Sequence, residues 1–91
     1  SMGLRSRAAL LFSARRAHRV LGCTIRTKPG YPVEELEEAL GASGITIIDK
    51  RVFDHPEDRV FELKLAGPAR QFDIVSDKLL RHEGVLGVIF S

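Results

Sequence analysis

Residues 22–47 restrict the possible folds more than any other stretch, because their pattern predicts a strand, a sharp turn, a short helix and a second strand in succession. Around the start of this stretch, apolar residues alternate with small or polar ones. The apolar residues are Leu21, Cys23 and Ile25. This period of two is typical of a strand with one buried face. The Pro29-Gly30 pair then favours a tight turn, and Pro32 suits the first position of a helix. The stretch therefore predicts a β-α-β unit joined by a Pro-Gly turn.

The helix predicted after the turn has one apolar and one acidic side. Its apolar positions are Val33, Leu36, Ala39 and Leu40, and its acidic ones are Glu34, Glu35, Glu37 and Glu38. The acidic residues nearest the N-terminus also suit the helix dipole. Gly41 and Gly44 can both end the helix, and the β-branched run 45–48 predicts a strand.

The rest of the chain predicts a hairpin, a second helix and a last strand. The inward positions change from odd to even residue numbers near residues 49–50, which predicts a bulge in the second strand. A polar turn at 54–58 leads into a third strand, and Gly67-Pro68 begins a second helix. The inward residues of these two elements are Phe61, Leu63 and Leu65, followed by Phe72, Val75 and Leu79. Residues 85–90 are predicted to form a final strand that is apolar on both faces.

The order β-α-β-β-α-β predicts an α+β, ferredoxin-like fold. This fold is a four-stranded antiparallel sheet of order 4-1-3-2 with both helices on one face. The other face is then bare, and Val20, Val85 and Ile89 are expected on it or at the sheet edge. Because they expose more apolar surface than a lone small domain usually does, they are candidate interface residues. We expect a second protomer, a partner domain or the N-terminal segment to cover them.

The length of 91 residues allows one domain with a single modest core. Ser1-Met2 resembles a cloning remnant, so residues 1–17 are interpreted as that remnant plus a basic segment, and residues 18–91 as the domain. The single cysteine excludes an internal disulfide, and the inward position of Cys23 favours a buried structural thiol. The three histidines are too far apart in the sequence for a local zinc motif.

The net charge of +2 is unevenly distributed along the chain. The first twenty residues hold five of the 14 basic residues and no acid, which leaves −3 on the rest. The five are Arg5, Arg7, Arg15, Arg16 and Arg19. Residues 4–17 are predicted to form a weakly amphipathic basic helix. It is interpreted as a loose appendage, as a segment docked on the domain or a second copy, or as a juxtamembrane segment whose arginines face anionic lipid.

Taken together, these motifs resemble ACT domains over roughly residues 18–90. In that family a Pro-Gly turn ends the first strand and a Gly-Ile-x-Ile motif begins the second, as do Pro29-Gly30 and Gly44 to Ile47 here. The resemblance implies a ligand-binding turn at Lys28, Pro29, Gly30 and Tyr31, where a glycine lets a ligand approach the backbone. Lys28 replaces the acidic residue that often precedes Pro-Gly in amino-acid-sensing members, and the turn alone also accounts for the glycine.

The closing segment 79–90 is similar to that of the cytosolic C-terminal domain of MgtC/SapB-type bacterial membrane proteins. Membership implies a regulatory and association domain on the cytoplasmic face of the bacterial inner membrane, linked to adaptation to low magnesium. It would act as a homo-oligomer or with another protein domain, attached to the membrane through an upstream transmembrane region. The alternative is an ACT domain that binds an amino acid at a dimer interface and regulates an attached enzyme or transcription regulator.

Other classes of function find less support in the sequence. No acid, base or nucleophile is matched to a partner as catalysis requires, so we expect neither an enzyme nor a cofactor. Asp54, Glu57 and Asp58 crowd the hairpin turn as candidate Mg²⁺ ligands, although most such clusters are solvated turns. The first and third strands lack an outward aromatic pair for stacking bases, so no specific nucleic-acid partner is expected.

Overall fold

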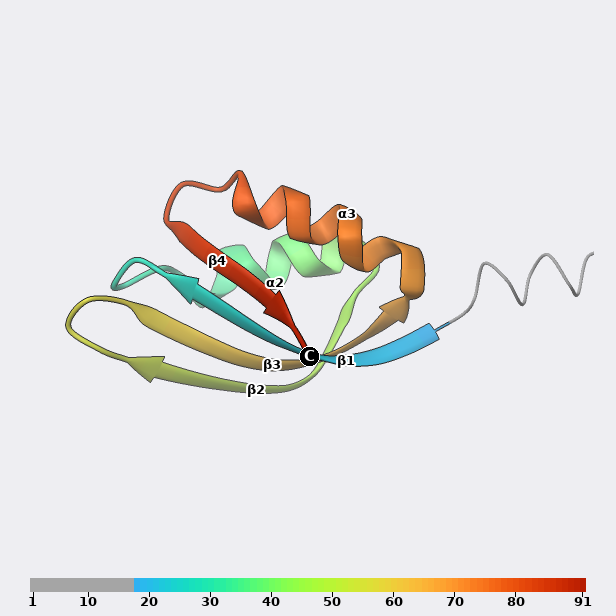
Figure 1. The fold of residues 1–91 in the computed structure, drawn as a ribbon, viewed down its shortest axis with the longest axis horizontal. Helices are drawn as coiled ribbons and strands as arrows, with labels where there is room; N and C mark the ends of the chain where they lie inside the picture. The colour runs from blue at the N-terminus through green and yellow to red at the C-terminus, as the bar shows by residue number, and fades with distance from the viewer. Residues whose placement is uncertain (1–17) are drawn as a thin grey trace, which may run out of the picture.

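The computed structural model describes residues 18–91, which form a four-stranded antiparallel sheet with two helices on one face (Figure 1). The elements are β1 (His18–Thr27), α2 (Val33–Ala42), β2 (Thr46–Asp54), β3 (Arg59–Pro68), α3 (Ala69–Leu80) and β4 (Val85–Phe90). The strand order β2-β3-β1-β4 is the predicted order 4-1-3-2 counted from the opposite edge. The α+β arrangement is therefore confirmed, and it is compatible with a ferredoxin-like fold.

The predicted basic helix over residues 4–17, with Arg5, Arg7, Arg15 and Arg16, lies outside the described residues. Arg19 lies within them, as an exposed residue near the start of β1. Neither α2 nor α3 is both long and apolar enough to span a bilayer.

The core lies between the sheet and the two helices. The strands contribute Cys23, Ile25, Phe61, Leu63 and Leu65, and the helices contribute Leu36, Leu40, Phe72, Val75 and Leu79. All ten were predicted to point inward from the period of two in the strands and the three- and four-residue spacing in the helices. Those predictions are confirmed.

Both helices begin directly after a proline in extended conformation. Pro32 precedes α2 and Pro68 precedes α3, and neither makes a side-chain capping bond. Proline suits this place because the first N–H groups of a helix have no partner within it. The predicted start of α2 near Pro32 is confirmed.

Two irregularities change which residues reach each face of the sheet. The pairing of β2 with β3 shifts between Ile47 and Asp49, which confirms the predicted bulge. A second shift lies between Arg26 and Thr27 of β1, opposite β4, and it was not predicted.

The second shift corrects the placement of Val85. Thr27 pairs with Val85 while its neighbour Arg26 pairs with Gly87, so one residue of β4 is skipped. An extra residue reverses the alternation of sides along a strand. Val85 therefore points into the core and is 9% exposed, whereas Ile89 points the other way and is 67% exposed. The expectation that both share the bare face is wrong for Val85.

The sheet surface turned away from the helices is called the open face here. It consists of His18, Val20, Gly22, Thr24 and Arg26 of β1; Thr46, Asp49, Arg51 and Phe53 of β2; Val60, Glu62, Lys64 and Ala66 of β3; and Gly87 and Ile89 of β4. Asp49 pairs with Lys64 and Arg51 with Glu62, so opposite charges face each other across β2 and β3. The β1 and β4 side carries a single charged residue, Arg26, at its far end. The part of the open face formed by Val20, Gly22, Thr24, Gly87 and Ile89, called its uncharged half below, therefore carries no charge.

The ladder between β1 and β4 continues past Phe90. The Gly22 N–H donates to the carbonyl of Ser91 at 3.1 Å, and the Ser91 N–H donates to the carbonyl of Gly22 at 2.8 Å. A Cβ on Gly22 would lie 2.7 Å from the Ser91 hydroxyl oxygen, which can rotate away, and 3.7 Å from the Ser91 carbonyl oxygen, an ordinary contact distance.

Candidate functional site

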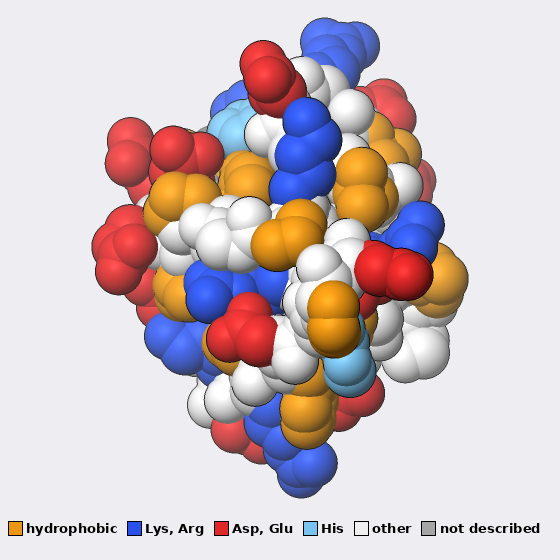
Figure 2. Space-filling view, turned by 90° about the vertical axis from the view of Figure 1, so that its left-hand side faces the viewer, with side chains coloured by type: hydrophobic (Ala, Val, Ile, Leu, Met, Phe, Trp, Pro, Cys, Tyr) orange, Lys and Arg blue, Asp and Glu red, His pale blue; other side chains and the backbone are white. Residues whose placement is uncertain are grey.

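The predicted ligand-binding turn lies at the end of the molecule where three connections come together, seen end-on in Figure 2. The Lys28 N–H donates to the carbonyl of Gly84, in the connection between α3 and β4, at 2.8 Å. On the other side, the Arg59 guanidinium donates to the carbonyl of Tyr31 at 2.8 Å. Figure 2 shows acidic, basic and hydrophobic side chains interspersed over this end, with no large patch of one kind. The turn is thus held in place from both sides.

Tyr31 does not present its side chain to a ligand, contrary to the prediction from the turn. The Tyr31 N–H donates to the carbonyl of Lys28 at 3.3 Å, and the ring is buried at 6% exposure. It meets the ring of Phe61 edge-on, with centroids 6.5 Å apart. Its hydroxyl lies 3.3 Å from Nδ1 of His82. Burial, and then the nearby carboxylate of Glu35, raise the pKa of Tyr31. Tyr31 is therefore a core residue that joins the turn to the end of α3.

Lys28, Pro29 and Gly30 are exposed, as a ligand-binding turn requires. Gly30 has a φ of 75°, a backbone conformation that side chains with a Cβ disfavour. A Cβ built on it would have no atom of the protein within 4 Å. The backbone conformation alone therefore accounts for glycine here.

Replacing Gly30 by alanine is expected to lower the free energy of unfolding by about 1–2 kcal/mol, because only its positive φ resists a side chain. Gly41 is the control, since it also has open space around a Cβ but lies within α2. Gly41→Ala is expected to raise stability by about 0.5 kcal/mol. Urea unfolding curves measure both. Equal effects of the two substitutions would contradict the conformational explanation.

Two of the three carboxylates proposed for Mg²⁺ contact arginines. Asp54 receives hydrogen bonds from Arg59, at 2.5 Å from Nε and 3.3 Å from Nη2, and this bonding lowers the pKa of Asp54. Asp58 lies 3.6 Å from Arg26, while Glu57 is exposed. Across residues 18–91, no three His, Cys, Asp or Glu side chains are grouped to hold a metal ion. The arrangement favours a hairpin tied by ion pairs.

Cys23 is 2% exposed, as predicted for a structural thiol. Burial raises its pKa from 9.0 to about 12, so the thiol stays protonated at neutral pH. A protonated and inaccessible sulfur is a poor nucleophile.

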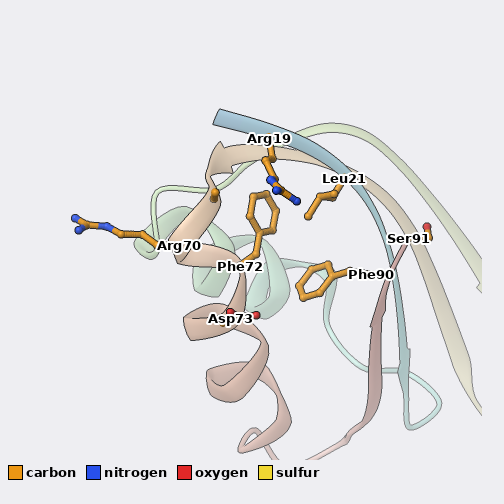
Figure 3. A pocket seen from close by; sticks show the side chains of 8 residues that line it. Arg19, Leu21, Arg70, Phe72, Asp73, Phe90 and Ser91 are labelled. Carbon is orange, nitrogen blue, oxygen red and sulfur yellow. The ribbon is translucent and has the colours of Figure 1, made fainter. Parts of the chain in front are cut away.

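Two cavities are not lined by the exposed turn residues Lys28, Pro29 and Gly30. One of about 300 Å³ lies between the helices and is lined by Glu35, Glu38, Ala39, Ala42, Lys78 and His82. The other, of about 630 Å³, lies beside the start of β1 and the start of α3 (Figure 3). The second cavity was not predicted, because its lining residues come from three separate elements. No protein-family model and no curated protein matches this chain, so its function is inferred from these residues.

Proposed function

We propose that this domain is a non-catalytic association module that pairs with a second copy of itself through the open face. The main support for this proposal is that two apolar residues are exposed on the uncharged half of that face, Ile89 at 67% and Val20 at 55%. We further propose a ferredoxin-like, ACT-type regulatory domain of an MgtC/SapB-type membrane protein linked to low-magnesium adaptation. The basic residues between Arg5 and Arg19 would then lie toward the cytoplasmic membrane surface.

The uncharged half is suited to contact another flat surface. Ile89 lies beside Thr24, and the neighbouring Gly87 has no side chain to hold a partner away. Full burial of one isoleucine side chain contributes about 1.5–3 kcal/mol. In a two-fold symmetric pair each contact occurs twice. A second copy therefore fits this half of the open face.

Replacing Ile89 by lysine is expected to weaken self-association by about 100-fold or more, because two apolar contacts are lost and two charges introduced. Light scattering over a concentration series measures the change in mass. Ile74→Lys is the matched control, since Ile74 is an isoleucine 50% exposed on α3, in the helical layer. An unchanged mass for Ile89→Lys, or an equal loss in both variants, would contradict association through the open face.

A second candidate function is the binding of an amino acid at the turn. The exposure of residues 28–30 and the two hydrogen bonds that fix the turn favour it. Amide NMR titration with pooled amino acids tests it, and saturable shifts centred on residues 28–31 are expected. A membrane-spanning segment encoded directly upstream would favour the MgtC/SapB-type domain. A catalytic or DNA-binding domain encoded there would favour amino-acid binding.

A further inference from the structure

The larger cavity combines an apolar floor with charged side chains at its rim (Figure 3). Its lining residues are Arg19 and Leu21 of β1, Ala69, Arg70, Phe72 and Asp73 of α3, and Phe90 and Ser91 at the end of the chain. Its volume of about 630 Å³ lies within the range typical of small-molecule sites.

Two phenylalanines make the floor of this cavity. The rings of Phe72 and Phe90 meet edge-on with centroids 5.6 Å apart. Phe72 is 3% exposed and anchored in the core, and Leu21 packs against the same core from β1. The floor is therefore rigid and apolar, suited to a flat or extended hydrocarbon group.

The charges around the floor are not equivalent. Figure 3 shows the Arg19 side chain turned into the cavity between Leu21 and Phe72, whereas Arg70 extends away from it. Asp73 lies further along α3, on the other side of Phe72. The first turn of α3 holds no acidic residue, so its partial positive charge adds to that of Arg19. The region beside Arg19 thus favours a negative group.

We propose that this cavity binds a small amphipathic carboxylate. Its carboxylate would accept hydrogen bonds from the Arg19 guanidinium, and its hydrocarbon body would lie on Phe72 and Phe90. Arginine suits such a head group because its planar guanidinium donates two parallel hydrogen bonds. Residues 1–17 are a poorer occupant, since their four arginines would meet the like charge of Arg19. The proposal is independent of association, because the cavity is not on the open face.

Amide NMR titration of the whole chain with octanoate and with 3-phenylpropionate tests the proposal and distinguishes an aliphatic from an aromatic body. Saturable shifts are expected at residues 19–21, 69–73 and 90–91. The uncharged amides, octanamide and 3-phenylpropionamide, are expected to bind at least about ten-fold more weakly, because they lose a charge-assisted hydrogen bond.

Three substitutions make the test specific to the charges. Arg19→Gln is expected to weaken carboxylate binding about ten-fold or more, while Asp73→Asn is expected to tighten it by removing a nearby negative charge. Arg51→Gln, on the open face, is the control for a general loss of positive charge and is expected to change nothing. Native amide spectra of each variant verify the fold.

Several outcomes would overturn the proposal. These are equal affinity for the acids and their amides, no saturable shift, or equal weakening by Arg19→Gln and Arg51→Gln. Nuclear Overhauser contacts from Leu11 or Phe12 to Phe72 in the free chain would show that residues 1–17 fill the cavity. Concentration-dependent shifts of the lining amides without ligand would show that a second copy does.

Discussion

Replacing Leu40 by alanine is expected to lower the free energy of unfolding by about 3–4 kcal/mol. Leu40 is 0% exposed and lies in the middle of the core, on the buried stripe of α2. The substitution removes apolar contacts and leaves a cavity that its neighbours only partly fill. A domain of this size has a total stability of about 4–11 kcal/mol, so the variant should be close to unfolding. Urea unfolding followed by circular dichroism measures the loss.

Leu80→Ala is the matched control, because the same atoms are removed from the last residue of α3. Leu80 is 49% exposed, so its loss is expected to cost about 1 kcal/mol or less. A similar cost for both substitutions would mean that α2 does not pack on the sheet as described.

The buried thiol of Cys23 is expected to make stability fall steeply in alkali. Burial raises its pKa from 9.0 to about 12, so the unfolded chain loses this proton at lower pH than the folded protein does. The contribution is fully present below about pH 9 and is lost as the pH rises toward the folded pKa. Between about pH 8 and about pH 11, the free energy of unfolding should drop by about 3 kcal/mol from this group.

The control isolates Cys23 from other groups that titrate in the same range, such as Tyr31, whose pKa is also raised. Urea unfolding of the protein and of Cys23→Ala is compared at each pH. The difference between their slopes of unfolding free energy against pH gives the contribution of the thiol. Parallel pH profiles for the two proteins would refute an ionisation suppressed by burial.

Much of the fold could be predicted because local patterns and tertiary packing agree. The leucines of α2 and the alternating residues of β1 and β3 mark their buried faces directly, since each element has a single apolar side. The bulge in β2 was predictable for the same reason, because inward parity changes between Ile47 and Val52.

The remaining features depend on contacts between distant segments. Residues 85–90 are apolar at nearly every position, so the sequence does not indicate which of them point inward. Only the pairing with β1 shows that Val85 does. Tyr31 looked accessible beside a Pro-Gly turn, yet Phe61 and His82 provide a place for its ring. Arg19 was grouped with the arginines before it, while the sheet brings it close to Phe72 and Phe90.

The pairing of β4 with β1 also determines how the domain would respond to mechanical load. The two strands are antiparallel, and the ladder ends with Ser91 bonded to Gly22, near the start of β1. A force applied between residues 18 and 91 would therefore act at the same end of both strands. It would break the hydrogen bonds between them one after another, as a zipper opens, because no pair of bonds would be loaded in shear. The last strand of the chain should thus peel away under small forces while β2 and β3 stay paired.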